Sequence, residues 1–196
     1  MLPYIPKSDA QYETEAVLDQ VMYHNNTAPF LSIRLIQRLG ISNPSPRYVQ
    51  SVSSAFISGS YTTVGFNDSV SFGTGQYGDL SATIAAILLD RESRSAVLDA
   101  DFSHGSIREP LVKVIATMRS LEYTHSDTSI EYLSLFELES KIGQMAHHSP
   151  SVFSFFLPEY APGGVIEKAG LVSPESMLLH KSIGLSNGLT SLVNFG

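Results

Sequence analysis

The sequence predicts an all-α protein, an irregular multi-helix bundle that forms a single helical domain over residues 1–196. Apolar residues recur at helical spacing in several segments, and most of these segments begin with a capping residue, a proline or both. The alternation typical of strands is weak and confined to one stretch. Because 43% of the residues are hydrophobic and 16% are charged, the chain is expected to fold around a core and not to remain disordered.

The first well-patterned helix is predicted to run from Thr27 to Leu39. Thr27 is placed to cap it, Pro29 suits its first turn and Gly40 is typical of its end. Its apolar residues cover most of its circumference, so other elements have to surround it. These residues are Phe30, Leu31, Ile33, Leu35, Ile36 and Leu39.

A second helix is predicted after the turn at residues 43–46. Ser45 is placed to accept a hydrogen bond from the first free amides, and Pro46 has the backbone angle of a first helical residue. The apolar residues that follow lie on one stripe, which predicts a buried face. They are Tyr48, Val49, Val52, Ala55 and Phe56.

Two further helices are predicted to start at Asp79 and Pro110. An acidic cap and a proline at the first helical position are their respective start signals. The first helix is expected to extend to Asp90, and its apolar residues at helical spacing are Leu80, Ile84, Ile87 and Leu88. The second is expected to turn inward Leu111, Val114, Ile115, Met118 and Leu121.

Two more helices are expected toward the C-terminus. One, with a less sharp pattern, is predicted for residues 130–146. The other starts at Ser173-Pro174-Glu175, which combines a cap, a proline and an acidic first turn. Its apolar positions are Leu178, Leu185, Leu189 and Leu192.

Two segments depart from the helical pattern. Residues 58–77 are rich in Gly, Ser and Thr, and we expect a mobile insertion there, either a long loop or a small hairpin. Residues 152–165 are aromatic and punctuated by proline, which predicts an irregular segment packed by its own rings.

Composition narrows the classes of partner. The net charge is −7 without a basic cluster, whereas affinity for nucleic acid depends on Lys and Arg side chains that displace counterions. The chain has no cysteine, which excludes disulfides and thiolate zinc sites. No apolar run reaches the roughly 18 residues of a membrane span. We expect no nucleic-acid partner, no metal and no cofactor.

A glycine-rich string and three other short motifs imitate functional sites. Residues 73–78 fit the G-x-G-x-x-G of dinucleotide-binding folds, but that fingerprint works only between parallel strands, which this sequence does not predict. Nucleotide-cofactor binding there is the weaker alternative to a loop. Residues 184–188 (G-x-S-x-G), residues 99–105 (a partial calcium loop) and His147-His148 each lack the partners that their chemistry needs. We interpret these three as structural.

Several blocks occur in a fixed order along the chain. They begin with T-A-P-F-L-S-I-R-L at Thr27, S-N-P-S-P-R-Y-V at Ser42 and G-D-L-S-A-T-I at Gly78. They continue with R-E-P-L, P-S-V-F, P-E-Y-A-P and G-L-V-S-P-E. From about residue 18 onward this order resembles the middle and C-terminal part of one large family, catalogued as domain of unknown function 1800.

The resemblance implies a protein that acts outside the cell, in the periplasm or at the cell envelope. It also implies that these residues are the C-terminal part of a larger domain, so some apolar faces are expected to be exposed in isolation. We expect this of Phe30, Ile33 or Ile36, or of Leu189 and Val193. The expected partner is another protein or the N-terminal half, and a homo-oligomer is possible.

The resemblance also indicates candidate binding residues. Arg108-Glu109 before Pro110 is typical of a capping and salt-bridge device, yet an arginine there can also hold a carboxylate, a sulfate or a sugar hydroxyl. The candidate binding residues are Asn43, Ser45, Asp79, Arg108, Glu109 and Tyr160. We expect a binding or scaffolding protein, because the sequence contains no complete catalytic set and assigns no catalytic residue. The alternative is a hydrolase-like enzyme with a site around Asp79, Arg108, Glu109 and Tyr160.

Overall fold

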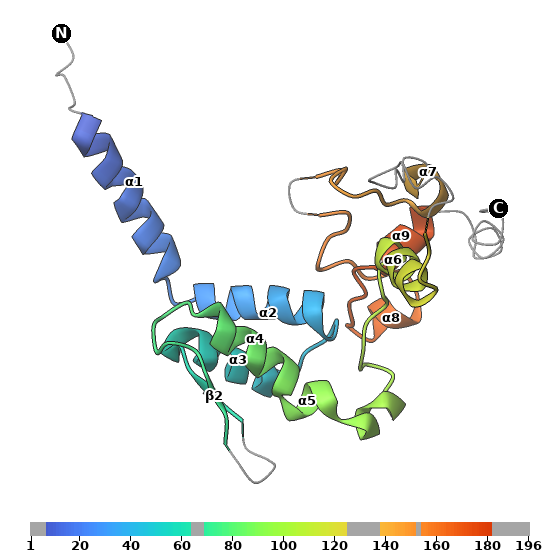
Figure 1. Cartoon of the computed structure of the whole chain (residues 1–196), viewed down its shortest axis with the longest axis horizontal. Helices are drawn as coiled ribbons and strands as arrows, with labels where there is room; N and C mark the ends of the chain where they lie inside the picture. The colour runs from blue at the N-terminus through green and yellow to red at the C-terminus, as the bar shows by residue number, and fades with distance from the viewer. Residues whose placement is uncertain (1–6, 64–68, 125–137, 152–153, 182–196) are drawn as a thin grey trace. The chain divides into compact units, whose positions relative to one another are not determined.

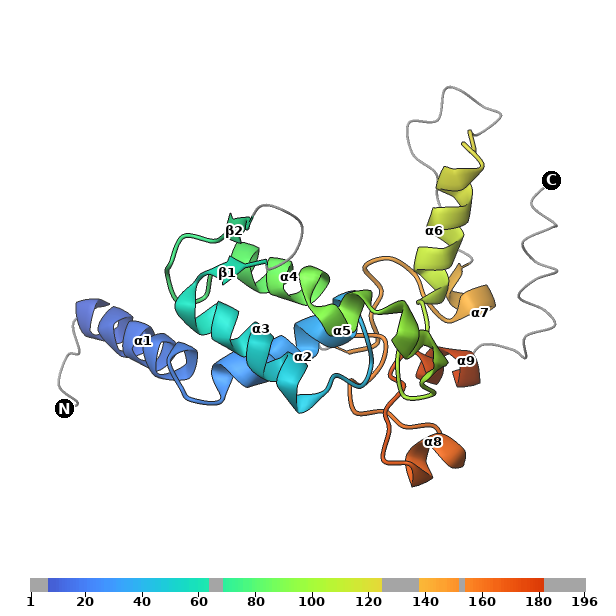
Figure 2. The same ribbon diagram turned by 90° about the horizontal axis from the view of Figure 1, so that it is seen from below.

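The computed structural model describes residues 7–63, 69–124, 138–151 and 154–181, and these are mainly α-helical (Figure 1, Figure 2). This confirms the fold class predicted from the sequence. The contacts divide the chain into two compact units, Met1–Ala100 and Asp101–Gly196, which are described separately below. The expectation of a single domain stays a prediction.

In the first unit, four longer helices are followed by two short ones. The longer helices are α1 (Lys7–Met22), α2 (Thr27–Leu39), α3 (Pro46–Ser58) and α4 (Leu80–Leu89). The short ones are α5 (Arg91–Arg94) and the 3-10 helix η1 (Ala96–Ala100). Between α3 and α4 lies an antiparallel hairpin of β1 (Tyr61–Thr62) and β2 (Ser71–Phe72), in which Tyr61 pairs with Phe72. Of the two structures predicted for residues 58–77, the hairpin is therefore the one observed.

Helices α2, α3 and α4 pack against one another and form the core of this unit (Figure 2). Small polar residues allow α2 and α3 to approach closely, because buried Ser53 donates its hydroxyl to buried Ser32 over 3.1 Å. The buried cluster consists of Ile36, Ile41, Tyr48, Val52, Ala55, Ala86 and Ile87. The predicted apolar face of α3 is thus confirmed.

The predicted start signals of α3 and α4 are confirmed, whereas that of α2 is wrong. Ser45 accepts from the amide of Tyr48 at 3.2 Å, and Asp79 accepts from the amide of Ala82 at 3.0 Å. Thr27 is already the first helical residue of α2, and its hydroxyl donates to the carbonyl of Val21 at 2.6 Å. The hydroxyl therefore links the start of α2 to the end of α1.

Helix α4 buries a different face from the one its large residues suggest. Its buried residues are Ala82, Thr83, Ala85, Ala86 and Ile87. Of the four apolar residues predicted to form its periodic face, only Ile87 is buried. Leu80, Ile84 and Leu88 are exposed, by 56%, 38% and 49%. The helix is apolar on both sides, and α3 packs against the side with small side chains.

The ends of the glycine-rich segment are held against α3. Gly59 ends α3 in the left-handed conformation, and its carbonyl accepts from the amide of Gly75 at 2.8 Å. The amide of Gly78 donates to the carbonyl of Phe56, also at 2.8 Å. These bonds tie both ends of the segment to the end of α3, and the expected mobility of the segment stays a prediction. The tip, residues 64–68, lies outside the described residues.

The second unit contains α6 (Pro110–Ser120), α7 (Leu138–Ile142), α8 (Val165–Lys168) and α9 (Ser176–Lys181). Pro110 opens α6 as predicted, but Leu121 follows the helix and is 74% exposed, so its predicted inward position is wrong. The helix predicted for residues 130–146 ends at Ile142, and residues 130–137 lie outside the described part. Leu185, Leu189 and Leu192 lie outside it as well.

Among the described residues, no helix combines the length and the apolar composition that crossing a membrane would need.

Candidate functional site

A charged cluster lies where α3 begins and α4 ends. Ser45 and Arg47 come from the start of α3, while Asp90 and Glu92 come from the junction of α4 and α5. Local helix signals position these side chains: Ser45 caps α3, and Asp90 caps α5 by accepting from the amide of Glu92 at 2.8 Å. The packing of α3 against α4 then brings the two helix starts together.

Arg47 binds both carboxylates of the cluster. Its two terminal nitrogens donate to the two oxygens of Asp90 at 3.0 and 2.6 Å, and one of them also donates to Glu92 at 3.1 Å. Asp90 is 5% exposed and Glu92 13%, whereas Arg47 is 38% exposed. The Ser45 amide donates to Glu92 at 2.9 Å, and the Ser45 hydroxyl donates to its other oxygen. The fork geometry is the strong form of this pairing.

The cluster holds its groups in fixed charge states. Burial opposes ionisation of Asp90, but hydrogen bonds from Arg47 and from the Glu92 amide outweigh it, so the pKa of Asp90 is lowered. The hydrogen bond with Asp90 raises the pKa of Arg47. Burial raises the pKa of Tyr48 to about 12, and its hydroxyl donates to the carbonyl of Ile87 at 2.6 Å. None of these groups changes charge near neutral pH.

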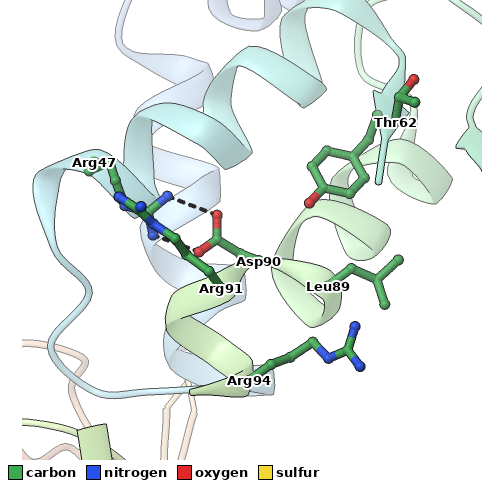
Figure 3. A pocket seen from close by; sticks show the side chains of 7 residues that line it. Arg47, Thr62, Leu89, Asp90, Arg91 and Arg94 are labelled. Atoms are coloured by element: carbon green, nitrogen blue, oxygen red, sulfur yellow. Dashed lines mark hydrogen bonds and ion pairs between the residues drawn. The ribbon is translucent and has the colours of Figure 1, made fainter. Parts of the chain in front are cut away.

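An open hollow of about 530 Å³ adjoins the cluster. Figure 3 shows Arg47 turned toward Asp90, and Arg94 on the side of the hollow where Leu89 lies. The hollow is lined by Arg47, Tyr61, Thr62, Leu89, Asp90, Arg91 and Arg94. Sequence reasoning found Ser45 through its capping role but missed Arg47, Asp90 and the two further arginines. Charged residues at the helix starts were the available signal.

Asp79 lies at the opposite end of α4 from this cluster. The helix has 10 residues, so its ends are about 15 Å apart. One oxygen of Asp79 accepts from both the amide and the hydroxyl of Thr74 at 2.7 Å, and the other accepts from the amide of Ala82. The structure therefore does not bring Asp79 together with Ser45.

We expect the carboxyl carbon of Asp79 to titrate near pH 2 in an NMR experiment. The hydrogen bonds from the Ala82 amide and from Thr74 lower the pKa of Asp79 from 3.8 to about 2. A lowered pKa means that the ionised cap stabilises the fold above pH 3.8, and that this contribution is lost as the pH falls toward 2. Thr74→Val removes one bond and should move the midpoint upward.

Asp101 provides the control for this titration. Its pKa is also lowered, by the amide and hydroxyl of Ser103, and Thr74 is not among the groups that shift it. Its midpoint should be the same in the wild type and in Thr74→Val. A wild-type midpoint of Asp79 near 3.8, or no change on Thr74→Val, would contradict the hydrogen-bonded cap.

The other predicted site residues have separate surroundings. Asn43 is half-buried in the connection between α2 and α3 of the first unit. In the second unit Arg108 is exposed, and Glu109 accepts from the side-chain amide of Gln144 at 2.6 Å. Gln144 is 1% exposed and also accepts from the Leu111 amide at 3.0 Å, so it joins α6 to the segment after α7. Tyr160 accepts through its main-chain carbonyl from Ser173 at 2.8 Å.

The glycine-rich string at residues 73–78 uses its amides within the chain. The amides of Thr74, Gly75 and Gly78 donate to Asp79, to the carbonyl of Gly59 and to the carbonyl of Phe56. A dinucleotide-binding loop instead directs its free amides at phosphate. The strand before the string is paired antiparallel, which is not the parallel arrangement that the fingerprint needs. Among the described residues, no group of His, Asp and Glu has an arrangement suited to a metal ion.

Comparison with known proteins gives one match. The sequence pattern of the family described as "Protein of unknown function (DUF1800)" matches residues 4–179. No curated protein and no solved structure matches the chain. The matched range includes α3, α4 and α5, and therefore the charged cluster.

Proposed function

We propose that this chain, which belongs to the DUF1800 family of proteins of unknown function, is a helical binding or scaffolding component and not an enzyme. A single observation carries the proposal: the large aliphatic side chains of α4 form a stripe that stays exposed. We call Leu80, Ile84 and Leu88 the α4 stripe. The proposed occupant of this stripe is another protein with a complementary apolar surface.

The α4 stripe has the spacing of a contact surface. Its three residues are four positions apart, so they lie above one another on a single helix face. Each is between 38% and 56% exposed, and the opposite face of the same helix is fully occupied by the core. Covering such side chains contributes on the order of 1 to 2 kcal/mol each. A helix that is apolar all round is stable when it is surrounded.

Exposure on α2 supports a covered surface only in part. Phe30 is 50% exposed, in agreement with the expectation for the helix at residues 27–39. Ile33 is half-buried and Ile36 is completely buried, so Phe30 is the residue of these three whose exposure meets the expectation. Leu189 and Val193 lie outside the described residues. The large apolar side chains of α4 are thus more consistently exposed than those of α2, where the exposure was expected.

The state of the charged groups favours binding over the hydrolase alternative. A general acid or base works best when its pKa lies near the working pH. Hydrogen bonds lower the pKa of Asp79 to about 2, and the pKa of Asp90 is also lowered. Both carboxylates are engaged as helix caps, and Glu109 is bound by Gln144. The contacts of these three carboxylates are therefore those of groups that stabilise the fold.

We also propose that the protein acts outside the cytoplasm or at the cell envelope, and family resemblance is what supports this location. Fractionation of source cells with an antibody against the chain tests it. Recovery in the extracellular, periplasmic or envelope fraction is expected, and recovery in the cytoplasm alone would exclude it.

Replacing the α4 stripe is expected to reduce association without unfolding the protein. The variant Leu80→Gln/Leu88→Gln removes two exposed aliphatic side chains of the stripe. Light scattering should detect association of the wild-type chain, or a hydrophobic dye should bind to it, and the variant should lose most of that signal. The matched control is Val70→Gln/Val97→Gln, which changes two exposed valines outside the stripe and should leave the signal unchanged.

Each possible result decides the proposal. A wild-type protein that is monomeric and binds no dye contradicts it. A double variant that unfolds at clearly lower denaturant concentration shows that the stripe belongs to the protein's own core, and this also contradicts it. Self-association that the variant abolishes identifies a second copy as a partner, whereas dye binding by a monomer indicates a different protein.

A further inference from the structure

We propose that the hollow beside Asp90 is a binding site for an oxyanion, the phosphate or carboxylate group of a small molecule. The site is formed by Arg91 and Arg94 of α5, with Arg47, Tyr61 and Thr62 around them (Figure 3). This inference concerns a surface other than the α4 stripe and does not depend on it.

Three arginines line the hollow, although the protein as a whole has a negative net charge. The chain has 12 Lys and Arg residues and a net charge of −7, yet three of those cations line one hollow. Asp90 is the one acidic residue among the lining residues. Arg47 is paired with both Asp90 and Glu92, so the excess of positive charge that attracts a diffusing anion is supplied by Arg91 and Arg94.

The charge of Asp90 is already compensated. Both of its oxygens accept from the fork of Arg47, and one also accepts from the Glu92 amide. Both oxygens of Asp90 are thereby engaged by Arg47, which also binds Glu92, and neither oxygen is paired with Arg91 or Arg94 in the described part of the chain. Among the described residues neither Arg91 nor Arg94 has an ion pair or a hydrogen bond through its side chain.

Arg91 and Arg94 both belong to α5, and Figure 3 draws Arg91 toward Arg47 and Arg94 toward the side where Leu89 lies. They are three residues apart, which brings two like charges onto neighbouring positions of a helix and costs a few tenths of a kcal/mol. An anion in the hollow reduces this repulsion and accepts from planar guanidinium groups, whose donor geometry fits phosphate and carboxylate oxygens. The free state of the hollow is therefore the less favourable one electrostatically.

The other walls suit a ligand larger than a bare ion. The hollow has a volume of about 530 Å³, and Tyr61, Thr62 and Leu89 contribute a ring, a hydroxyl and an aliphatic side chain. Tyr61 is half-buried and close enough to Arg94 for the arginine charge to act on its hydroxyl. The Thr62 hydroxyl bonds to that of Ser71 at 2.9 Å, which fixes its position at the rim. A small molecule with one anionic group and an apolar or sugar body fits these walls.

Titration of the ¹⁵N-labelled chain with inorganic phosphate and, separately, with acetate tests the proposal. At least one of the two ions should produce saturable shifts at the amides of residues 61–62 and 89–94. Phosphate alone identifies a phosphate-bearing ligand, acetate alone a carboxylate-bearing one, and both support the shared oxyanion chemistry. Sodium chloride at the same ionic strength provides the control for screening.

The variant Arg91→Gln/Arg94→Gln should bind the same ion at least about tenfold more weakly, because two charge-assisted contacts are lost. The control Lys113→Gln/Arg119→Gln changes the net charge equally in the second unit and should bind as the wild type does. If the double variant does not fold, Arg94→Gln alone should weaken binding by about threefold. Shifts that do not saturate, that chloride reproduces or that survive loss of the arginines would overturn the proposal.

Discussion

Gly59→Ala is expected to destabilise the protein by about 3 kcal/mol or more, measured by urea unfolding. Gly59 ends α3 with φ of 64°, a conformation that costs a residue with a side chain roughly 1 kcal/mol. An added Cβ would also lie 2.0 Å from the carbonyl oxygen and 2.3 Å from the nitrogen of Gln76. Both atoms belong to the backbone, so the turn itself would have to move.

Movement of that turn carries a further cost. The amide of Gly75 donates to the Gly59 carbonyl, and the amide of Gly78 donates to the Phe56 carbonyl. Each bond contributes about 1 kcal/mol. The turn leads directly to Asp79 and the start of α4, so its displacement also disturbs the position of the α4 stripe.

Gly75→Ala is the matched control for this prediction. Gly75 has a similar backbone angle, with φ of 79°, but no atom lies within 4 Å of its added Cβ. Its substitution should cost only the conformational preference, roughly 1 kcal/mol. Equal losses of stability in the two variants would show that the close approach of Gly59 to Gln76 does not exist in solution.

The start signals of helices were predictable because they act over a few residues. Ser45 and Asp79 each accept from an amide three positions along, and Pro110 needs only its own ring to suit a first turn. Thr27 was mistaken for a cap because its hydroxyl does not accept from an amide of α2 but donates to the carbonyl of Val21 at the end of α1. The sequence therefore located the start of α2 correctly but assigned the wrong hydrogen bond to the Thr27 hydroxyl.

The buried face of α4 was not predictable from its own pattern. Nearly all of its residues are apolar or small, so the helical period points in no single direction. The buried face is determined by the packing of α3 on α4, which places Ala86 and Ile87 in the buried cluster and leaves Leu80 and Leu88 exposed. The contact is close because Tyr48 reaches the carbonyl of Ile87 with its hydroxyl.

The charged cluster depends on contacts that are distant in sequence. Arg47 and Asp90 are 43 residues apart, and only the packing of α3 on α4 brings them into contact. The sequence places Arg47 near the start of one predicted helix and Asp90 at the end of another, but it does not show that the two residues meet. Ser45 was identified as a candidate because its cap is local, and its bond to Glu92 became visible only in the structure.

Arg47→Met is expected to lower the free energy of unfolding by about 2 to 3 kcal/mol at neutral pH. Methionine keeps the apolar stem but leaves the buried carboxylate of Asp90 without its counter-charge. Breaking a fully buried pair typically costs about 3 to 5 kcal/mol, and we expect less because Arg47 is 38% exposed and partly screened by solvent. Arg119→Met, at an exposed arginine of the second unit, should change stability by less than about 0.5 kcal/mol.

The pH dependence identifies the cause of this loss. In the wild type the pKa of Asp90 lies below 3.8, so its ionised form stabilises the fold above that pH and the contribution is lost as the pH falls through the lowered pKa. Without Arg47, burial becomes the dominant influence and raises the pKa of Asp90, so the variant should lose less stability on acidification than the wild type does. Asp90→Asn in the Arg47→Met background should restore part of the stability at neutral pH, because no buried charge is left unpaired. A loss that is independent of pH and unaffected by Asp90→Asn would mean that Arg47 acts through packing alone.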